Sequence, residues 1–285
     1  MPPLNLTQQP LIMGIVNVTP DSFSGDGVMK DSTFVAAARD RAAAMLGEGA
    51  DIIDIGGESS RPGSSPIRAE EEINRIVPVV AAIRAKCGAT PVISIDTTKA
   101  VVAEAALAAG ANIINDITAL QSDPALAAVV ARHGCPIVLM HNRSQPKDVA
   151  MLSRIGWQYG AAVYGNVIED VKRDLSTCID TALSAGIAET NIIVDPGLGF
   201  GKSVAQNLAL VKHIAEIKQL GYPVMVGASR KSFIGHTLDL PIEERLEGTA
   251  AIVALSAFLG ADIIRVHDVK FMTRVTRMAV AVRDS

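Results

Sequence analysis

Short apolar runs recur along the whole chain, and polar residues follow each of them. Every run has four to seven residues, is rich in β-branched side chains, and lacks the alternation of a strand with one solvated face. We therefore predict eight strands that are buried on both faces. The runs lie at residues 12–18, 51–56, 91–95, 112–117, 136–140, 191–194, 223–226 and 262–266.

Helical patterns fill the intervals between these runs. They cover residues 32–45, 69–86, 98–109, 123–134, 160–186, 203–219, 243–259 and 269–282. Alternation of eight strands with eight helices predicts an α/β fold, a (β/α)₈ barrel that occupies residues 1–285 as one domain. A doubly wound open sheet is the alternative fold.

A faint internal repeat agrees with this alternation. The sequence Gly-Ala-Asp/Asn-Ile-Ile occurs at residues 49–53, 110–114 and 260–264. In each copy a glycine is expected to end a helix, and a strand follows at once.

Composition restricts the class of protein. The 285 residues are 49% apolar, which excludes a disordered chain, and 4% aromatic, which indicates an aliphatic core. The 26 basic and 30 acidic side chains give a net charge of −4, which argues against a dedicated nucleic-acid binder. The three cysteines are widely spaced, and no signal peptide or membrane-spanning run is evident, so we expect a cytoplasmic protein.

Polar residues at the predicted strand ends mark where a barrel carries its chemistry. Active sites of such barrels lie at the carboxyl ends of the strands. Any one of these residues could serve only to solvate the barrel mouth, but a complete ring indicates a site. The ring consists of Asn17, Asp54, Glu58, Asp96, Asn115, Asp116, His141, Asp195, residues 229–232, Arg265 and His267.

Part of this ring suits a flat heterocycle. Asp96, Asn115 and Asp195 supply acceptors for amino and ring N–H groups, and a carboxylate facing a guanidine-like edge forms paired, charge-assisted hydrogen bonds. For Asp54 and Asp116, helix capping or support of a neighbouring side chain is the alternative.

The cations of the ring and of two long loops suit an anion. The loops at residues 18–31 and 57–68 follow strands and are rich in Gly, Ser and Pro, so they are candidate lids. Simple solvent exposure is the alternative for Arg61 and Arg230. The cationic set is Arg61, Arg230, Lys231, Arg265 and His267.

A glycine-rich segment imitates a phosphate-binding loop. Residues 197–203 read Gly-Leu-Gly-Phe-Gly-Lys-Ser, but Pro196 stands where the phosphate-binding pattern needs its first glycine. We instead expect these glycines to let the backbone pass close beneath a planar ligand next to Asp195.

Eight segments carry polar motifs at or beside the predicted strand ends. The two longest are residues 14–24 (Gly-Ile-Val-Asn-Val-Thr-Pro-Asp-Ser-Phe-Ser) and 54–63 (Asp-Ile-Gly-Gly-Glu-Ser-Ser-Arg-Pro-Gly). The others are 94–97, 114–116, 139–141, 195–197, 229–232 and 265–268. As a set, in their order and over essentially the whole chain, these segments resemble the dihydropteroate synthases, and the two longest are similar to the two signatures of that family.

The resemblance implies a homodimeric transferase of folate biosynthesis and a target of sulfonamides. Its reaction would condense 6-hydroxymethyl-7,8-dihydropterin pyrophosphate with p-aminobenzoate, with Mg²⁺ as cofactor, to give 7,8-dihydropteroate and pyrophosphate. A dissociative, SN1-like displacement fits the charge set, because cations can stabilise the leaving group and Asp96 can stabilise positive charge on the ring.

The resemblance also implies roles for individual residues. Pterin would be held by Asp96, Asn115, Met140, Asp195, Phe200 and Lys231. Pyrophosphate would be bound by Asn17, Arg61, Arg265 and His267, with Asn17 also touching Mg²⁺. The p-aminobenzoate site would be shaped by Phe23, Ser60, Arg61, Pro62 and Ser232, and the catalytic set would be Asp96, Lys231, Arg265 and His267.

Two other functions compete with the synthase. A pterin-binding methyltransferase that takes its methyl group from methyltetrahydrofolate would share the Asp96, Asn115 and Asp195 positions. It would not need residues 229–232 or the pair Arg265 and His267 for pyrophosphate, and this chain has both. A non-catalytic pterin-binding module would be expected to have a broken ring of strand-end residues.

The loops depart from the family pattern at two positions. Ser60 replaces a threonine that is common in the family, and Ser144 stands where a glycine is frequent.

Overall fold

Eight strands lie parallel in one sheet, and its two edges meet. The computed structural model describes residues 9–19, 31–59, 64–144, 149–152 and 155–285. The strand order is β8-β5-β4-β3-β2-β1-β10-β9. The barrel closes between β8 and β9 through a single bridge, in which Val194 pairs with Val224. The Val194 N–H donates to the Pro223 carbonyl at 2.9 Å. The strands are β1 (Leu11–Asn17), β2 (Ile52–Gly56), β3 (Val92–Asp96), β4 (Ile113–Asp116), β5 (Ile137–Met140), β8 (Ile192–Asp195), β9 (Met225–Val226) and β10 (Ile263–Val266).

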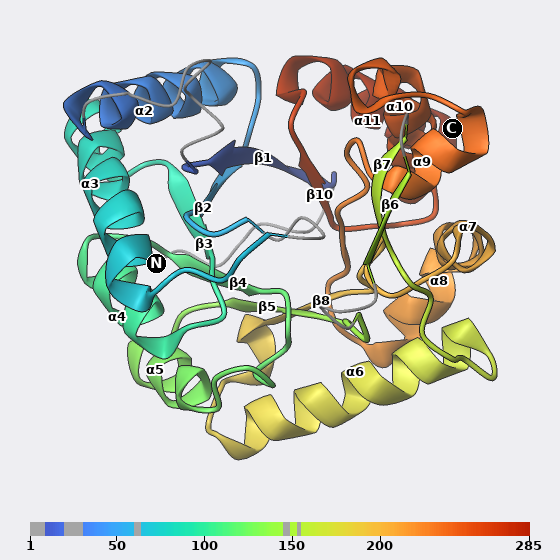
Figure 1. The fold of residues 1–285 in the computed structure, drawn as a ribbon, viewed down its shortest axis with the longest axis horizontal. Helices are drawn as coiled ribbons and strands as arrows, with labels where there is room; N and C mark the ends of the chain where they lie inside the picture. Colours follow the sequence, from blue (N-terminus) through green and yellow to red (C-terminus); the bar gives the residue numbers. More distant parts are fainter. Residues whose placement is uncertain (1–8, 20–30, 60–63, 145–148, 153–154) are drawn as a thin grey trace.

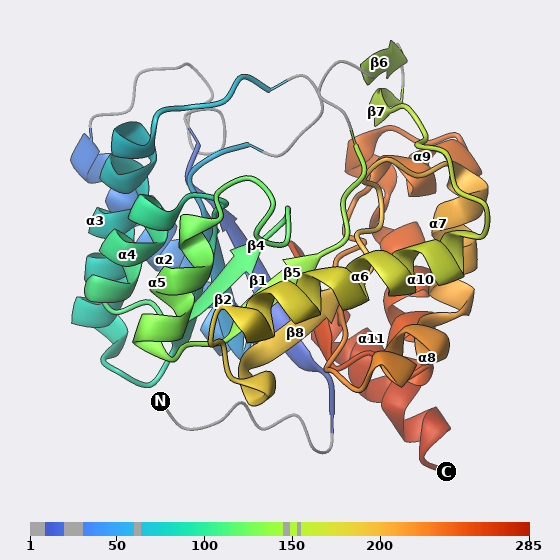
Figure 2. The ribbon, with the colours of Figure 1, turned by 90° about the horizontal axis from the view of Figure 1, so that it is seen from below.

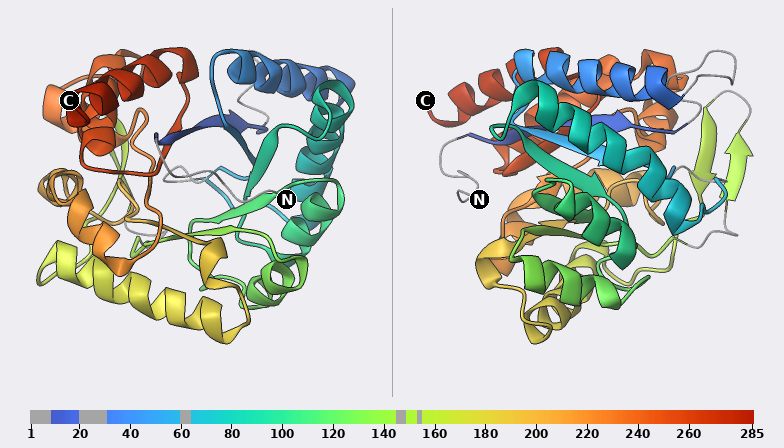
Figure 3. Two further views of the ribbon diagram at one scale, coloured as in Figure 1. Left: turned by 180° about the vertical axis from the view of Figure 1, so that it is seen from behind. Right: turned by 90° about the vertical axis from the view of Figure 1, so that its left-hand side faces the viewer.

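Helices surround this barrel on the outside, as Figure 1 and the rear view in Figure 3 illustrate. The predicted barrel is confirmed, and the open sheet is wrong. The helices are α2 (Asp31–Gly47), α3 (Ala69–Cys87), α4 (Ala100–Ala108), α5 (Ala125–His133), α6 (Val167–Ser184), α7 (Val204–Lys212), α8 (Ile214–Ile217), α9 (Ser232–Leu238), α10 (Leu246–Phe258) and α11 (Val269–Arg283).

One predicted helix begins later than expected. Helix α6 starts at Val167 rather than near residue 160, because the Asn166 side chain caps it and accepts from the Ile168 N–H at 3.0 Å. An antiparallel hairpin precedes this helix, formed by β6 (Val149–Leu152) and β7 (Gly156–Tyr159). The sequence pattern predicted neither the hairpin nor the short helix α9.

The hairpin lies beyond the carboxyl ends of the barrel strands, close to α9. The chain's C-terminus lies at the opposite end of the barrel (Figures 2 and 3). Arg245, at the start of α10, contacts the hairpin just before β7 by donating from Nη2 to the Ile155 carbonyl at 2.6 Å. The hairpin therefore stands at the end of the barrel where the polar residues were predicted.

The internal repeat fixes the other end of the barrel. Each of its glycines has a positive φ: 103° at Gly49, 109° at Gly110 and 92° at Gly260. In each copy the following Asp or Asn side chain accepts from a backbone N–H of the neighbouring strand. These bonds join Asp51 to Ile12 at 2.8 Å, Asn112 to Ile93 at 2.9 Å and Asp262 to Val224 at 2.8 Å.

Large aliphatic side chains fill the barrel interior. They form a layer separate from the larger core between strands and helices, and each fully buried side chain of this kind contributes about 1.5–3 kcal/mol. The interior layer is Met13, Ile52, Ile113, Val138, Ile193, Met225 and Ile263.

Two sequence expectations concern the cell compartment. None of the helices in the described part of the chain combines the length and the hydropathy needed to cross a bilayer. Cys87, Cys135 and Cys178 are free thiols.

Candidate active site

Strand alternation places most of the predicted site residues on the inner face of the barrel. Successive side chains of a strand point to opposite faces, so a residue two or four positions after an interior residue shares its face. Asp54 follows Ile52 in this way, and Asn115 follows Ile113. The residues that share this inner face above the aliphatic layer are Asn17, Asp54, Asp96, Asn115, Met140, Asp195 and Arg265.

Arg265 connects three of these strands. Its Nε donates to Asp54 Oδ2 at 2.7 Å, and its Nη2 donates to Asp96 Oδ2 at 2.7 Å. Asn115 Nδ2 donates to the same Asp54 oxygen at 3.1 Å. Asp54 is fully buried and holds Arg265 and Asn115 through Oδ2, which is the supporting arrangement given as its alternative in the sequence analysis.

Acceptors remain available at this end of the barrel. Burial raises the pKa of Asp96 to about 7, although the positive charge of Arg265 opposes the shift. Asn115 is almost completely buried, and its Oδ1 has no hydrogen-bond partner within the described ranges. A buried acceptor without a partner costs free energy, and a donor on a bound ligand could remove that cost.

Asp195 and Lys231 form the opposite side of the site. Burial raises the pKa of Asp195, and the Gly197 N–H donates to its Oδ1 at 2.7 Å. Burial lowers the pKa of Lys231 to about 8, with Asp195 and Asp96 opposing that shift. Lys231 Nζ donates to the Leu198 carbonyl. Both residues are thus anchored on the loop between β8 and α7.

Two apolar side chains and one glycine complete this side. Phe200 presents its ring to Lys231, with Nζ 4.6 Å from the ring centroid, which is a cation–π distance. Met140 ends β5 and is buried. A Cβ atom placed on Gly227 would lie 3.8 Å from the Arg265 side chain and 3.9 Å from Asp195 Oδ2, so these two side chains flank the glycine.

The remaining predicted anion-binding residues have defined positions. His267 Nδ1 lies 3.0 Å from Ser229 Oγ, and its backbone N–H donates to the same oxygen at 3.2 Å. Asn17 Oδ1 and Asp96 Oδ2 each lie 3.8 Å from where a Cβ of Gly56 would stand. Arg230 pairs with Asp268 at 3.0 and 2.7 Å, so an ion pair rather than plain solvent exposure accounts for it.

Three members of the predicted polar ring do not face this site. Asp116 lies on the outer face and accepts from Thr118 N at 2.8 Å and Leu120 N at 2.6 Å, so it stabilises its own turn. Glu58 pairs with Lys99 at the start of α4. His141 points outward to Asp174 of α6, with Nε2 3.2 Å from Oδ2. For Asp116 and His141, alternation separates the outward residue from its inward neighbour, which strand-end position alone does not reveal. Glu58 lies beyond the end of β2, where this alternation no longer applies.

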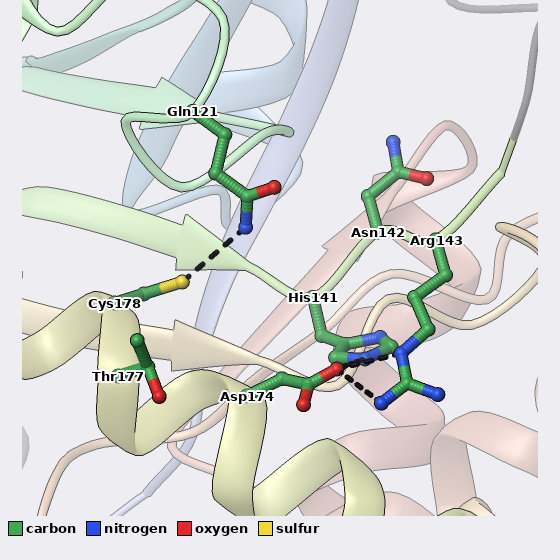
Figure 4. A pocket seen from close by; sticks show the side chains of 7 residues that line it. All are labelled: Gln121, His141, Asn142, Arg143, Asp174, Thr177 and Cys178. Atoms are coloured by element: carbon green, nitrogen blue, oxygen red, sulfur yellow. Dashed lines mark hydrogen bonds and ion pairs between the residues drawn. The ribbon is translucent and has the colours of Figure 1, made fainter.

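His141 lines a separate polar cavity of about 330 Å³ behind β5 (Figure 4). Arg143 donates from Nε to Asp174 Oδ2 at 2.6 Å, and Gln121 Nε2 lies 3.6 Å from Cys178 Sγ. Burial lowers the pKa of His141 to about 3, so the ring is neutral at neutral pH. None of the residues that line this cavity belongs to the inner-face set.

The residues expected from the two loops are only partly placed. Phe23, Ser60, Arg61 and Pro62 lie outside the described residues. Ser232 is described and begins α9, directly after Lys231. Of the residues predicted to form the p-aminobenzoate site, Ser232 is therefore the one whose position the structure describes.

Sequence reasoning missed one buried cation, Lys202. Its side chain is 3% exposed, and Nζ donates to the carbonyls of Gly197 at 2.8 Å, Phe200 at 2.9 Å and His141 at 3.4 Å. It belongs to the segment that imitates a phosphate-binding loop. The lysine contacts its own loop, and a Cβ at Gly197 would overlap the His141 carbonyl, so protein backbone rather than a ligand requires this glycine.

A magnesium ion implied by the resemblance can be tested against these donors. Within the described residues there is no group of three His, Cys, Asp or Glu side chains that could hold a metal. Mg²⁺ commonly keeps several waters and binds through one or two protein oxygens together with substrate phosphates. Asn17, an amide at the barrel mouth near Asp96, fits that mode as a single protein ligand.

Comparison with known proteins agrees with the geometry. The profile of the family described as "Pterin binding enzyme" matches residues 13–267. The chain is 46% identical over 275 residues to the dihydropteroate synthase of Bacillus subtilis, covering 96% of this chain and 89% of that protein. It is 40% identical to the Escherichia coli K12 enzyme, covering 95% and 91%.

Solved structures give the same result. The Xanthomonas albilineans dihydropteroate synthase with 4-aminobenzoic acid superposes with a TM-score of 0.87 at 39% identity, covering 98% of this chain and 95% of that one. The same enzyme in complex with 7,8-dihydropteroate superposes with a TM-score of 0.84 at 38% identity, covering 99% and 96%. The fold and the inner-face residues thus define a barrel enzyme of the transferase class. The chain belongs to the pterin-binding enzymes, and within them to the dihydropteroate synthase family.

Proposed function

We propose that this chain condenses 6-hydroxymethyl-7,8-dihydropterin pyrophosphate with p-aminobenzoate, releasing 7,8-dihydropteroate and pyrophosphate. The observation that carries the proposal is the inner-face set in which Arg265 joins Asp54 and Asp96, opposite Asp195 and Lys231. This set offers acceptors for a pterin beside cations for a leaving anion. The relatives whose structures hold 4-aminobenzoic acid or 7,8-dihydropteroate support the same substrates.

The pterin ring would lie among the acceptors of β3, β4 and β8. Asp96, the free Oδ1 of Asn115 and Asp195 accept from its amino and ring N–H groups, while Lys231 donates to a ring acceptor. Met140 and Phe200 supply the apolar contacts. A carboxylate next to the ring also stabilises positive charge that develops on it.

The pyrophosphate would lie at the barrel mouth near Asn17, Arg265 and His267, with Arg61 approaching from the second loop. Arg265 uses Nε and Nη2 for carboxylates, so it stays oriented while an anion binds beside it. Magnesium bound at Asn17 together with the pyrophosphate would supply Lewis-acid stabilisation of the leaving group.

The displacement follows a dissociative, SN1-like path in this proposal. The bond between the pterin CH₂ carbon and the bridging oxygen breaks, and its electron pair leaves with pyrophosphate. The neutral aniline nitrogen then forms the new C–N bond and releases its proton to solvent or pyrophosphate. A strong general base is not needed. Once the C–N bond has formed, the nitrogen is an anilinium cation, and an anilinium loses its proton readily.

The p-aminobenzoate site would be formed by Ser232 and the two loops, with Phe23, Ser60, Arg61 and Pro62 covering it. Ser232 lies at the first turn of α9, where backbone N–H groups favour a carboxylate. Because sulfonamides imitate p-aminobenzoate, they would compete for this site. A Yersinia pestis relative has been solved with a sulfonamide drug.

A homodimer in the cytoplasm completes the proposal. Large apolar side chains on α10 and α11 are exposed, with Leu255 at 50%, Phe258 at 46%, Met278 at 65% and Val282 at 53%. A contiguous apolar surface of this kind suits a second copy of the chain. The three free thiols suit a reducing compartment.

The test is a condensation assay with purified protein. Pterin pyrophosphate, Mg²⁺ and p-aminobenzoate are mixed, and pyrophosphate release is followed with and without p-aminobenzoate. Release that depends on p-aminobenzoate and disappears with EDTA supports the proposal. Tight pterin binding without release contradicts it and favours a pterin-dependent methyltransferase or a binding module.

A further inference from the structure

Lys202 is a buried lysine that the proposed chemistry does not use, and burial lowers its pKa to about 7. Its ammonium group has three N–H donors, and three backbone carbonyls surround it, those of Gly197, Phe200 and His141. Two of these carbonyls belong to the loop after β8, and the third follows β5. The lysine therefore ties the β8–α7 loop to the neighbouring strand end from beneath.

The segment that Lys202 holds carries the contacts of two predicted pterin-binding residues. Gly197 donates to the Asp195 carboxylate, Leu198 accepts from Lys231, and Phe200 packs its ring against the same ammonium. The space is narrow, because a Cβ at Gly199 would be 2.9 Å from Lys231 Cδ. A shift of this segment would thus move both charges.

Asn207 of α7 supports the same segment from the other side. It is almost completely buried, accepts from the Gly199 N–H at 2.6 Å, and donates to the carbonyl of Lys202 at 3.2 Å. The helix start is itself fixed, since Ser203 and Gln206 form a capping box. The loop is therefore held by side-chain hydrogen bonds rather than by regular secondary structure.

We propose that Lys202 is a positioning residue for pterin binding, which holds residues 197–200 so that Asp195 and Lys231 face the ring. The inference rests on the proposed function. A lysine suits this role because its ammonium can donate to several carbonyls at once, whereas an apolar side chain would leave buried carbonyls without partners.

The test compares Lys202→Met with Lys212→Met, a matched change at an exposed lysine of α7. Calorimetry measures the Kd of 6-hydroxymethyl-7,8-dihydropterin pyrophosphate without p-aminobenzoate, and steady-state kinetics gives a KM for each substrate. For Lys202→Met we expect the pterin Kd and KM to rise about tenfold or more, a loss consistent with one or two charge-assisted hydrogen bonds. The KM for p-aminobenzoate should rise several-fold less, and Lys212→Met should match the wild type.

The KM comparison separates positioning from simple loss of folded protein. A smaller folded fraction lowers the apparent kcat and leaves both KM values unchanged. If Lys202→Met does not fold, Lys202→Gln retains an amide that can donate to two of the carbonyls, and it should give an intermediate pterin Kd.

The outcomes also distinguish this inference from the proposed function. If wild type neither binds the pterin nor turns it over, the proposed function fails. If wild type binds and the folded Lys202 variants bind equally well, the positioning role is overturned while the proposed function stands.

Discussion

Arg265 donates from Nε to Asp54 Oδ2 at 2.7 Å, although 211 positions separate the two residues. Asp54 is completely buried on β2 and also accepts from Asn115. A single carboxylate thus orients a cation that would bind pyrophosphate and an amide that would bind the pterin. It supports both side chains through Oδ2 alone, because its Oδ1 has no hydrogen-bond partner among the described residues.

Removing the charge of Asp54 should affect stability and activity together. Asp54→Asn leaves Arg265 with Asp96 as its remaining salt-bridge partner in the described part of the chain. Breaking a buried ion pair typically costs about 3–5 kcal/mol, and the remaining partner places the expected loss at about 3 kcal/mol. Urea unfolding measures it, with the exposed Asp40→Asn as the control, whose stability should stay close to that of wild type. A stability equal to wild type would contradict the supporting role.

The proposed chemistry depends most on Asp96 and Lys231. Asp96→Asn removes the charge that stabilises the cationic ring, and Lys231→Ala removes a donor to the pterin. Each should lower kcat by about 100-fold or more, as losses of preorganised charged groups commonly do. Pyrophosphate release measures the rate, and Lys86→Ala at an exposed position is the control. Near wild-type rates in both active-site variants would refute the assignment.

His141 should make stability fall in acid. Burial holds the pKa of the folded protein's His141 at about 3, against 6.5 for the ordinary side chain. Between these values the unfolded chain binds the extra proton, so stability falls as pH falls, by up to about 1.4 kcal/mol per pH unit. The charged groups around the ring, Lys202, Arg143 and Asp174, remain in the variant His141→Gln.

Unfolding free energies at pH 6.5 and 4.5 test this titration. Wild type should lose about 2–3 kcal/mol more than His141→Gln between these two pH values. An identical pH dependence in wild type and His141→Gln would count against a buried neutral histidine.

Gly197 should tolerate no side chain. Its φ is +69°, and a Cβ would overlap the carbonyl oxygen of His141. We expect Gly197→Ala to cost at least about 3 kcal/mol, because left-handed strain adds to a clash with backbone. Gly221→Ala is the matched control, since its φ is +86° and its Cβ would meet nothing within 4 Å. Its cost should be about 1 kcal/mol in the same unfolding measurement.

The apolar face of α10 and α11 gives a prediction about assembly. Light scattering at micromolar concentration should give the mass of a dimer for wild type. The double variant Leu255→Glu with Met278→Glu places two charges on that face and should give the mass of a monomer. A monomeric wild type, or a dimer that survives both charges, would contradict the proposed interface.

The sequence predicted the barrel well because its signal is local. Eight continuous apolar runs identify strands buried on both faces, and the glycine of each repeat copy ends a helix. The hairpin at residues 149–159 was missed because it is short and lies outside the alternation of barrel strands and helices. The start of helix α6 was predicted too early, because the signal that begins it, the Asn166 N-cap, is a single side chain.

The site was predictable only as far as strand ends reveal it. Position along the sequence placed Asp96, Asn115, Asp195 and Arg265 at one end of the barrel. It did not separate His141 and Asp116, which point outward, from their inward neighbours Met140 and Asn115. The buried role of Lys202 depends on loop backbone that returns to β5, a contact across 61 positions that no local pattern encodes.

Alternation along the strands also governs how this protein can diverge. The inner-face side chains Asp54 and Asp96 both bind Arg265, whereas the outer-face side chain His141 contacts Asp174 of α6. Point substitutions at inner-face positions can therefore change substrate recognition and leave the packing of the surrounding helices unchanged. A one-residue insertion within β5 would instead bring His141 into the barrel and turn Met140 towards α6. The residue that lines the site and the residue that contacts the helix would then change places. Descendants of this chain should accordingly gain and lose residues in their loops and keep strand lengths constant.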